Sequence, residues 1–167
     1  NLYINGTLAG SVASATLSAS SMIIGYYYSS AYSFQGYLSD IKVVNGTAVY
    51  GGNFTPPTEP TGNTNAVFYV PCDNAGIFDK SGNNTLTIVG NASTSTTQTK
   101  YADTSIAFDG SGDYLEGPST NTVTNFGTND FTVEFWFYTN TTTSQQNLLD
   151  NIGGSSNGIY IPAGGGS

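Results

Sequence analysis

The chain has 167 residues, of which 38% are hydrophobic and only 8% are charged, and its formal net charge is −8. Its only basic side chains are three lysines, so it cannot form the basic patch of a nucleic-acid-binding protein, and neither binding to anionic membranes nor membrane insertion is expected. Its single cysteine excludes an intrachain disulfide, and the lack of histidine and of a cysteine cluster excludes a zinc site.

The first elements predicted along the chain are a hairpin and a short buried strand. Residues 2–8 (LYINGTL) hold the pair Asn5-Gly6, which accepts the positive φ angles of a type I′ turn. Residues 22–25 (MIIG) form a short apolar run, which predicts a buried strand. An aromatic and serine-rich loop follows at residues 26–33 (YYYSSAYS).

A regular strand is predicted over residues 36–44 (GYLSDIKVV). Its apolar residues alternate, but Leu38 is out of phase with those that follow it, which predicts a β-bulge near Asp40. Asp40 is expected to pair with Lys42 or to lie on a sheet face, in a structural role.

The composition changes at residues 54–63 (FTPPTEPTGN), which hold three prolines and little besides Phe54 that could pack. Proline density favours an extended and semi-rigid connector. This segment is the best candidate for a domain boundary, with the linker itself at residues 59–65.

The rest of the chain alternates short apolar runs with turns rich in Gly, Asn and Ser. Residues 105–115 (SIAFDGSGDYL) predict a hairpin whose turn lies at residues 109–113. Residues 131–138 (FTVEFWFY) predict a strand with one wholly apolar face and one aromatic face that carries a single acid. No helix is predicted, and about eleven short strands indicate an all-β fold, an antiparallel β-sandwich.

Several segments resemble a known family. FDGSGDYLEG followed by NDFTVEFWFY resembles the opening of a laminin-G-like domain of the concanavalin-A-like lectin and glucanase superfamily, of the type repeated in phage tail and bacterial surface proteins. FYVPCDNAGIFDKSGNNTLTIVGNAS and NLLDNIGGSSNGIYI extend this likeness. LYINGTLAG and FQGYLSDIKVVNGTAVYGGNFTPPTEP resemble the end of such a domain, although here they come first. The resemblance implies a jelly-roll sandwich.

This order of segments predicts the domain organisation. Residues 1–58 are interpreted as the C-terminal half of one laminin-G-like sandwich, and residues 66–167 as the N-terminal half of the next. The chain would then be a window across a tandem array; the alternative is one permuted or shortened sandwich. In the first case the two parts share no core, and each is completed by neighbouring copies or segments outside the chain. Self-association or tandem copies are therefore expected.

Two loops are candidate sites for a hard cation such as Ca²⁺, which takes oxygen ligands. Asp109 and Asp113 flank a Gly-Ser-Gly tip, although both acids could instead cap the turn through the backbone. In the second loop, Asp150 and Asn157 are the metal candidates, and by the resemblance such rim loops supply calcium and sugar ligands. A flexible Gly-Ser loop is the alternative for residues 150–157.

The aromatic residues suggest a glycan site, because sugar C–H faces stack on rings while hydroxyl groups bond to amides and carboxylates. The alternative is that the same rings fill the sandwich or an interface. The candidate carbohydrate-binding residues are Tyr26, Tyr27, Tyr28, Trp136, Tyr138 and Asn151.

Catalysis is not expected. By the resemblance, a glucanase of this superfamily would need clustered acids on one strand, but Glu59, Glu116 and Glu134 each lack an aspartate two residues on. Without histidine there is no Ser-His or Cys-His nucleophile either.

Two functions remain. One is a non-catalytic module that binds a glycan or cell-surface polysaccharide on a virion fibre or cell surface. The other is a structural repeat or filament subunit without a ligand. Both imply an extracellular, cell-surface or virion location.

Overall fold

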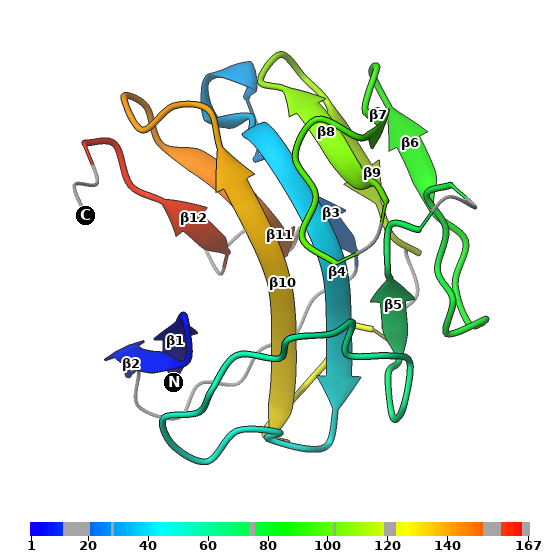
Figure 1. Cartoon of the computed structure of the whole chain (residues 1–167), viewed down its shortest axis with the longest axis vertical. Helices are drawn as coiled ribbons and strands as arrows, with labels where there is room; N and C mark the ends of the chain where they lie inside the picture. The colour runs from blue at the N-terminus through cyan, green and yellow to red at the C-terminus, as the bar shows by residue number, and fades with distance from the viewer. Residues whose placement is uncertain are drawn as a thin grey trace.

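The structure is a computed structural model that describes residues 1–11, 21–27, 29–73, 76–101, 103–118, 123–151 and 158–164. These residues contain no α-helix, only the short 3-10 turn η1 (Ser30–Tyr32). The remaining elements are β-strands that form two larger sheets and one separate hairpin (Figure 1).

The first sheet has the strand order β10-β4-β8-β7, and β5 also pairs with β4. All of its pairings are antiparallel. Its strands are β4 (Gln35–Asn45), β5 (Phe68–Val70), β7 (Ser93–Ser95), β8 (Ser105–Asp109) and β10 (Phe131–Thr139).

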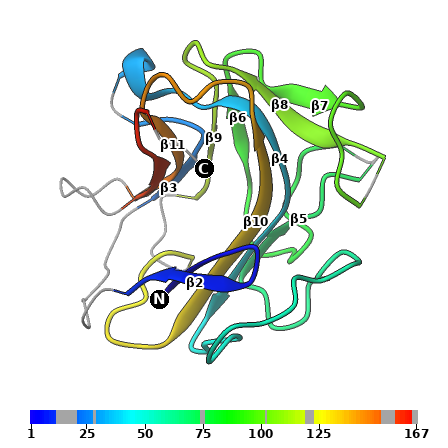
Figure 2. The ribbon, with the colours of Figure 1, turned by 60° about the vertical axis from the view of Figure 1, so that its left-hand side comes forward.

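The second sheet has the order β12-β11-β3-β9-β6, again with antiparallel pairings only. Figure 2 shows β3 and β11 on the left facing the curved strands β4 and β10 on the right. The antiparallel β-sandwich is therefore confirmed, while its finer description as a jelly roll stays a prediction. The strands of the second sheet are β3 (Met22–Ile24), β6 (Thr87–Val89), β9 (Tyr114–Glu116), β11 (Gln146–Asn151) and β12 (Ile159–Ile161).

The predicted N-terminal hairpin is confirmed as a sheet of two strands, β1 (Leu2–Ile4) and β2 (Thr7–Gly10). Asn5 and Gly6 both have positive φ angles, 49° and 77°, as a type I′ turn requires. Gly6 also lies against Phe54, whose carbonyl oxygen a side chain at position 6 would strike. The hairpin is thereby held close to the proline-rich segment.

One hydrophobic core lies between the two sheets. Alternation along each strand sends every second side chain inward, so that Leu38 and Ile106 of the first sheet meet residues of the second. The core residues include Met22, Ile24, Phe34, Leu38, Ile41, Val43, Phe68, Val70, Cys72, Ile106, Phe108, Leu115, Leu148 and Leu149, with Val133 and Phe135 packed against them.

The predicted bulge in β4 is confirmed. Asp40 has a positive φ of 52°, and the register between β4 and β10 shifts by one residue at this point. The extra residue restores the inward direction of Ile41 after Leu38. The edge of β4 that faces away from β10 also changes partner at this bulge: before the bulge it pairs with β8, and after the bulge it pairs with β5.

The predicted hairpin over residues 105–115 is wrong. β8 belongs to the first sheet and β9 to the second, so the intervening turn is a β-arch, a loop that carries the chain from one sheet to the other. The physical reason is that Phe108 and Leu115 both face the core from opposite sides instead of pairing with each other. The turn between β6 and β7 makes a second arch beside it.

The expectation of two separate sandwich bodies is also wrong. β4, from the first part of the chain, pairs with β8 and β10 from the second part, and both parts contribute to one core. Ile41 and Val43 share this core with Phe135. Whether the two parts correspond to the back and the front of a laminin-G-like domain stays a prediction.

The proline-rich segment is not a free linker. Phe54 stacks on Tyr50 at 3.6 Å between ring centroids, and the Pro57 carbonyl accepts a hydrogen bond from the Tyr101 hydroxyl. Further along, the Thr61 amide donates to the Asp40 carboxylate. In Figure 1 this segment runs across the front of β4 and β10, and it therefore covers part of the first sheet.

Candidate functional site

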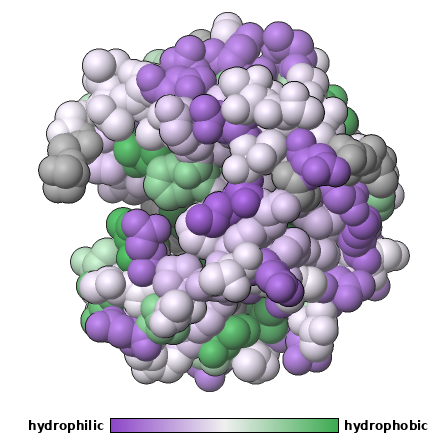
Figure 3. All heavy atoms as spheres, viewed as in Figure 1, coloured by the Kyte–Doolittle hydropathy of each residue, from purple (hydrophilic) through white to green (hydrophobic). Residues whose placement is uncertain are grey.

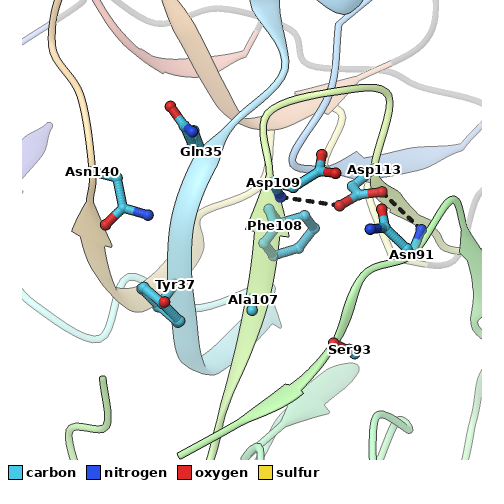
Figure 4. A pocket seen from close by; sticks show the side chains of 9 residues that line it. All are labelled: Gln35, Tyr37, Asn91, Ser93, Ala107, Phe108, Asp109, Asp113 and Asn140. Carbon is cyan, nitrogen blue, oxygen red and sulfur yellow. Dashed lines mark hydrogen bonds between the residues drawn. The ribbon is translucent and has the colours of Figure 1, made fainter. Parts of the chain in front are cut away.

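An open groove lies on the outer face of the first sheet, the face turned away from the core. We call it the outer groove. Its volume is about 310 Å³. It is lined by Gln35, Tyr37, Asn91, Ser93, Ala107, Phe108, Asp109, Asp113 and Asn140, which Figure 4 shows from close by. Of these, Phe108 and Asp113 are buried at the floor of the groove, and Phe108 also belongs to the core.

The sheet register explains why these residues meet. Ser93 lies opposite Ala107, Ala107 opposite Tyr37, and Tyr37 opposite Tyr138, so that one row of side chains crosses four strands. Paired residues in antiparallel strands point to the same face. Because Leu38 and Ile106, the neighbours of this row, point into the core, the row itself points outward.

Two tyrosines give the row an aromatic end. The rings of Tyr37 and Tyr138 have centroids 6.2 Å apart, and Tyr138 is 51% exposed. Next to them, the backbone amide of Asn140 donates to the backbone carbonyl of Gln35 at 2.9 Å, which holds both residues at the end of the groove. The site thus combines rings with side-chain amides.

The two acids of the β8–β9 arch have different roles. Asp113 is buried, and its two carboxylate oxygens accept hydrogen bonds from the backbone amides of Asn91 (2.8 Å) and Asp109 (3.0 Å) (Figure 4). Asp109 is exposed, and its carboxylate accepts a bond from the Ser111 amide at 2.7 Å. This is the turn-capping arrangement, and it fits the closure of two arches better than a calcium cradle.

The remaining calcium candidates lie elsewhere. Asp150 is buried in β11 of the second sheet, where its Cα pairs with Ile23. Asn157 lies outside the described residues, as does the side chain of Asn151. Within the described part of the chain, no group of three or more His, Cys, Asp or Glu side chains could hold a metal. Calcium binding by the loop at 150–157 stays a prediction.

Trp136 lies on the predicted aromatic face of β10, which the structure turns away from the core, and its ring already contacts Lys100 and Tyr101. The Lys100 ammonium lies 3.9 Å from the ring centroid, a cation–π geometry, and the Tyr101 ring meets it edge-on at 5.7 Å. A sugar that stacked on this face of Trp136 would have to displace the Lys100 ammonium.

The acids near Trp136 have structural partners. Glu134 accepts a hydrogen bond from the Tyr50 hydroxyl (2.7 Å) and lies 3.8 Å from the Lys42 ammonium, so Lys42 pairs with Glu134. Asp40 is buried and accepts a bond from the Tyr69 hydroxyl at 2.9 Å. Burial, and then the Asp40 carboxylate, raise the pKa of Tyr69. Asp40 therefore has the structural role expected of it.

The tyrosine loop after β3 lies apart from the outer groove. Tyr26 stacks on Tyr114 at 5.1 Å, and Tyr27 meets Tyr32 at 5.9 Å. None of these residues lines the groove, and Tyr28 lies outside the described residues. Among the predicted carbohydrate-binding residues whose side chains the structure describes, Tyr138 is the one that lies next to the groove, through its contact with Tyr37.

Sequence reasoning missed the polar residues that line the groove, of which Gln35, Asn91 and Asn140 come from three distant segments. The sequence held a signal for one other residue of the groove, Tyr37. The alternation of Tyr37 with Leu38 places Tyr37 on the outer face once the core side of β4 is known.

Comparisons of the chain with known protein families, with curated proteins and with solved structures gave no significant match. A membrane-spanning helix is not found among the residues that the structure describes. Function is therefore inferred from the chemistry of the groove.

Cys72 provides a test of the core. Its thiol is fully buried, and burial raises its pKa from 9.0 to about 12. In the native protein the thiol stays protonated at pH 8–9, so it should react with a disulfide reagent such as DTNB only after denaturation.

The raised pKa also predicts a loss of stability at alkaline pH. The unfolded thiol ionises above its ordinary value while the folded one does not, so stability is complete below about pH 9 and falls progressively up to about pH 12. Between pH 8 and pH 10.5 we expect wild type to lose about 2 kcal/mol more than the Cys72→Ala variant. Urea unfolding curves at both pH values measure this, and equal losses in the two proteins would contradict it.

Proposed function

We propose that the chain is a non-catalytic carbohydrate-binding or adhesion module, and that the outer groove with Tyr37 and Tyr138 is its sugar site. The observation that carries this proposal is the placement of Tyr37 beside side-chain amides in one open groove, with the outward-facing ring of Tyr138 next to it. A volume of about 310 Å³ is at the small end of ligand pockets. It suits one or two sugar rings.

The chemistry of the groove supports a sugar over other small ligands. The exposed ring of Tyr138 can stack on the C–H face of a pyranose, while Gln35, Asn91 and Asn140 can donate to and accept from its hydroxyl groups. Asp109 adds a further acceptor at the rim. Since the net charge is −8, we propose a neutral glycan or polysaccharide as the ligand.

The proposal includes no catalysis. Glycoside hydrolysis needs two carboxylates beside the scissile bond, whereas Asp113 is committed to two backbone amides. Glu134 is held by Tyr50 and Lys42. Such a module belongs on a virion fibre, a cell surface or another extracellular protein, and the resemblance to laminin-G-like domains is part of this proposal.

Replacing Tyr138 with alanine should weaken glycan binding about tenfold, because one stacking ring contributes on the order of 1 kcal/mol beyond its buried area. A screen of neutral oligosaccharides on an array would identify the ligand, and calorimetric titration with that oligosaccharide would measure affinity. The matched control is Tyr160→Ala, since Tyr160 is equally exposed (52%) but lies on β12 away from the groove. Equal loss in both variants, or no glycan bound by wild type, would overturn the proposal.

A second function, a structural repeat or filament subunit, is favoured by a different observation. Phe131 and Phe137 of β10 are 37% and 43% exposed, although they belong to the apolar face of the strand. Large apolar side chains left in water at a sheet edge are typical of surfaces that contact another chain.

A further inference from the structure

β10 has a long free edge. Among the residues that the structure describes, it is the outermost strand of the first sheet and pairs with β4 alone, over almost its whole length from Phe131 to Thr139. The other edge strands of the two larger sheets, β5, β6, β7 and β12, are each only three residues long. Long unpaired edges are rare in native proteins, because they present a row of unpaired amides and carbonyls.

Two hydrogen bonds show which groups this edge presents. The Gly46 amide donates to the Asp130 carbonyl, and the Asn140 amide donates to the Gln35 carbonyl. Even-numbered residues of β10 therefore direct their backbone groups toward β4. The groups of the odd-numbered residues between Phe131 and Thr139 point to the free edge.

The side chains do nothing to block this edge. Natural edge strands are protected by lysines, prolines or bulges, whereas β10 (FTVEFWFYT) has no proline and only one charge, Glu134. That charge is matched within the sheet by Lys42. The bulge at Asp40 lies in β4, not in β10.

The apolar face of β10 is also incompletely covered. Val43 and Ile106, on the inner strands, are fully buried, but Phe131 and Phe137 remain exposed and Val133 and Phe135 are only partly buried. Figure 3 shows a hollow on the left-hand side of the molecule, with apolar atoms in view, where Figure 1 has the space between β12 and the β1–β2 hairpin.

We propose that two copies of this chain pair through β10, antiparallel, about a two-fold axis that passes at Phe135. The first sheets of the two copies would become one continuous sheet, with their inner and outer faces aligned. Val133 of one copy would lie opposite Phe137 of the other, and Phe131 opposite Thr139. This goes beyond glycan binding, and it would also place two outer grooves on one sheet face.

The position of the Glu134 carboxylate and the number of paired residues favour the register with its axis at Phe135 over the alternatives. An axis at Phe135 uses all nine residues of β10 and places Glu134 opposite Trp136 of the other copy. An axis at Glu134 would place the two carboxylates directly opposite each other, which is destabilising. An axis further along would leave residues at the start of the strand unpaired.

The size of the contact sets the expected strength. Nine paired residues span roughly 30 Å. An interface built on one strand pair is at or below the lower end of stable dimers, which bury about 1,200–2,000 Å². We therefore expect a reversible dimer that dissociates on dilution.

Sedimentation velocity of the full chain, from low micromolar to near-millimolar concentration, should show a monomer that converts to a dimer. Phe137→Lys should weaken the dimer at least tenfold, because it places a charge on the edge strand opposite an apolar residue. Phe78→Lys is the control, since Phe78 is similarly exposed (39%) and lies outside β10. Circular dichroism spectra and melting curves check that both variants fold.

Disulfide trapping tests the register. Val133→Cys and Phe137→Cys proteins, mixed and oxidised, should form a heterodimer, while each alone should cross-link far less. The native Cys72 is buried and should not interfere. A wild type that stays monomeric at all concentrations would overturn the proposal. So would a dimer that Phe137→Lys leaves unchanged, or cross-linking that is equal in the mixed and the separate samples.

Discussion

Replacing Asp113 with alanine is expected to lower the free energy of unfolding by about 2–4 kcal/mol. The side chain is 1% exposed, and each of its oxygens accepts one backbone hydrogen bond. One bond reaches Asn91 in the β6–β7 arch, and the other reaches Asp109 in its own arch. Removing the carboxylate leaves both amides without this acceptor and separates two turns that it now joins.

The same turn offers a matched control. Asp109 is exposed and bonds only within its own turn, so Asp109→Ala should cost less than about 1 kcal/mol. Urea unfolding followed by circular dichroism measures both variants. Asp113→Asn should fall between them, because an amide can still accept one of the two bonds through its oxygen. If the two alanine variants are equally destabilised, Asp113 does not have this linking role.

Gly90 takes part in the same contact between the two arches. It has a φ of +77°, and a Cβ at this position would collide with the Asp113 carboxylate. The close approach of the two arches therefore depends on a residue without a side chain as well as on the buried acid.

Replacing Phe34 with alanine should have the largest effect, about 3–5 kcal/mol. Phe34 is fully buried and meets Phe108 edge-on at 5.8 Å. The two rings come from the two parts of the chain that the family resemblance would assign to different domains. Loss of either ring leaves a cavity in the one shared core.

The chain carries a convenient probe for this prediction. Trp136 is its only tryptophan and lies in the second part, whereas Phe34 lies in the first. In one cooperative unit, Phe34→Ala should shift the unfolding curve by Trp136 fluorescence and by circular dichroism equally. Two independent bodies would leave the fluorescence transition where it is in wild type. The exposed Phe78→Ala variant is the control and should cost less than about 1 kcal/mol.

Local signals in the sequence predicted local structure well. The Asn5-Gly6 turn and the bulge at Asp40 depend on a few adjacent residues, and both are confirmed. The strand at residues 131–138 was predicted from its two-residue period, and β10 covers it. In each case the signal and the structure lie within the same short segment.

Pairing between strands was harder to predict. An Asp-Gly-Ser-Gly-Asp turn between two apolar alternations suits a hairpin and a β-arch equally, because both need positive φ at glycine. What distinguishes them is whether Phe108 and Leu115 pair or face each other across a core. That depends on strands far away in the sequence, as does the shared core of the two parts.

The candidate site shows the same limit. Tyr138 and Asp109 could be singled out from their own strands and turns, but Gln35, Asn91 and Asn140 meet them only through the sheet order β10-β4-β8-β7. The two-residue period placed Trp136 on the aromatic face of its strand, yet no local signal could show that Lys100 would lie over its ring.

The central position of β4 has a consequence for folding during synthesis. Its partners β5, β8 and β10 all follow it in the sequence, and β10 begins only at Phe131. At ~5–20 residues added per second, both edges of β4 stay unpaired for seconds after it leaves the ribosome. Because contacts between such distant segments slow folding, nascent chains on one message could pair through β4 before their own β10 is made.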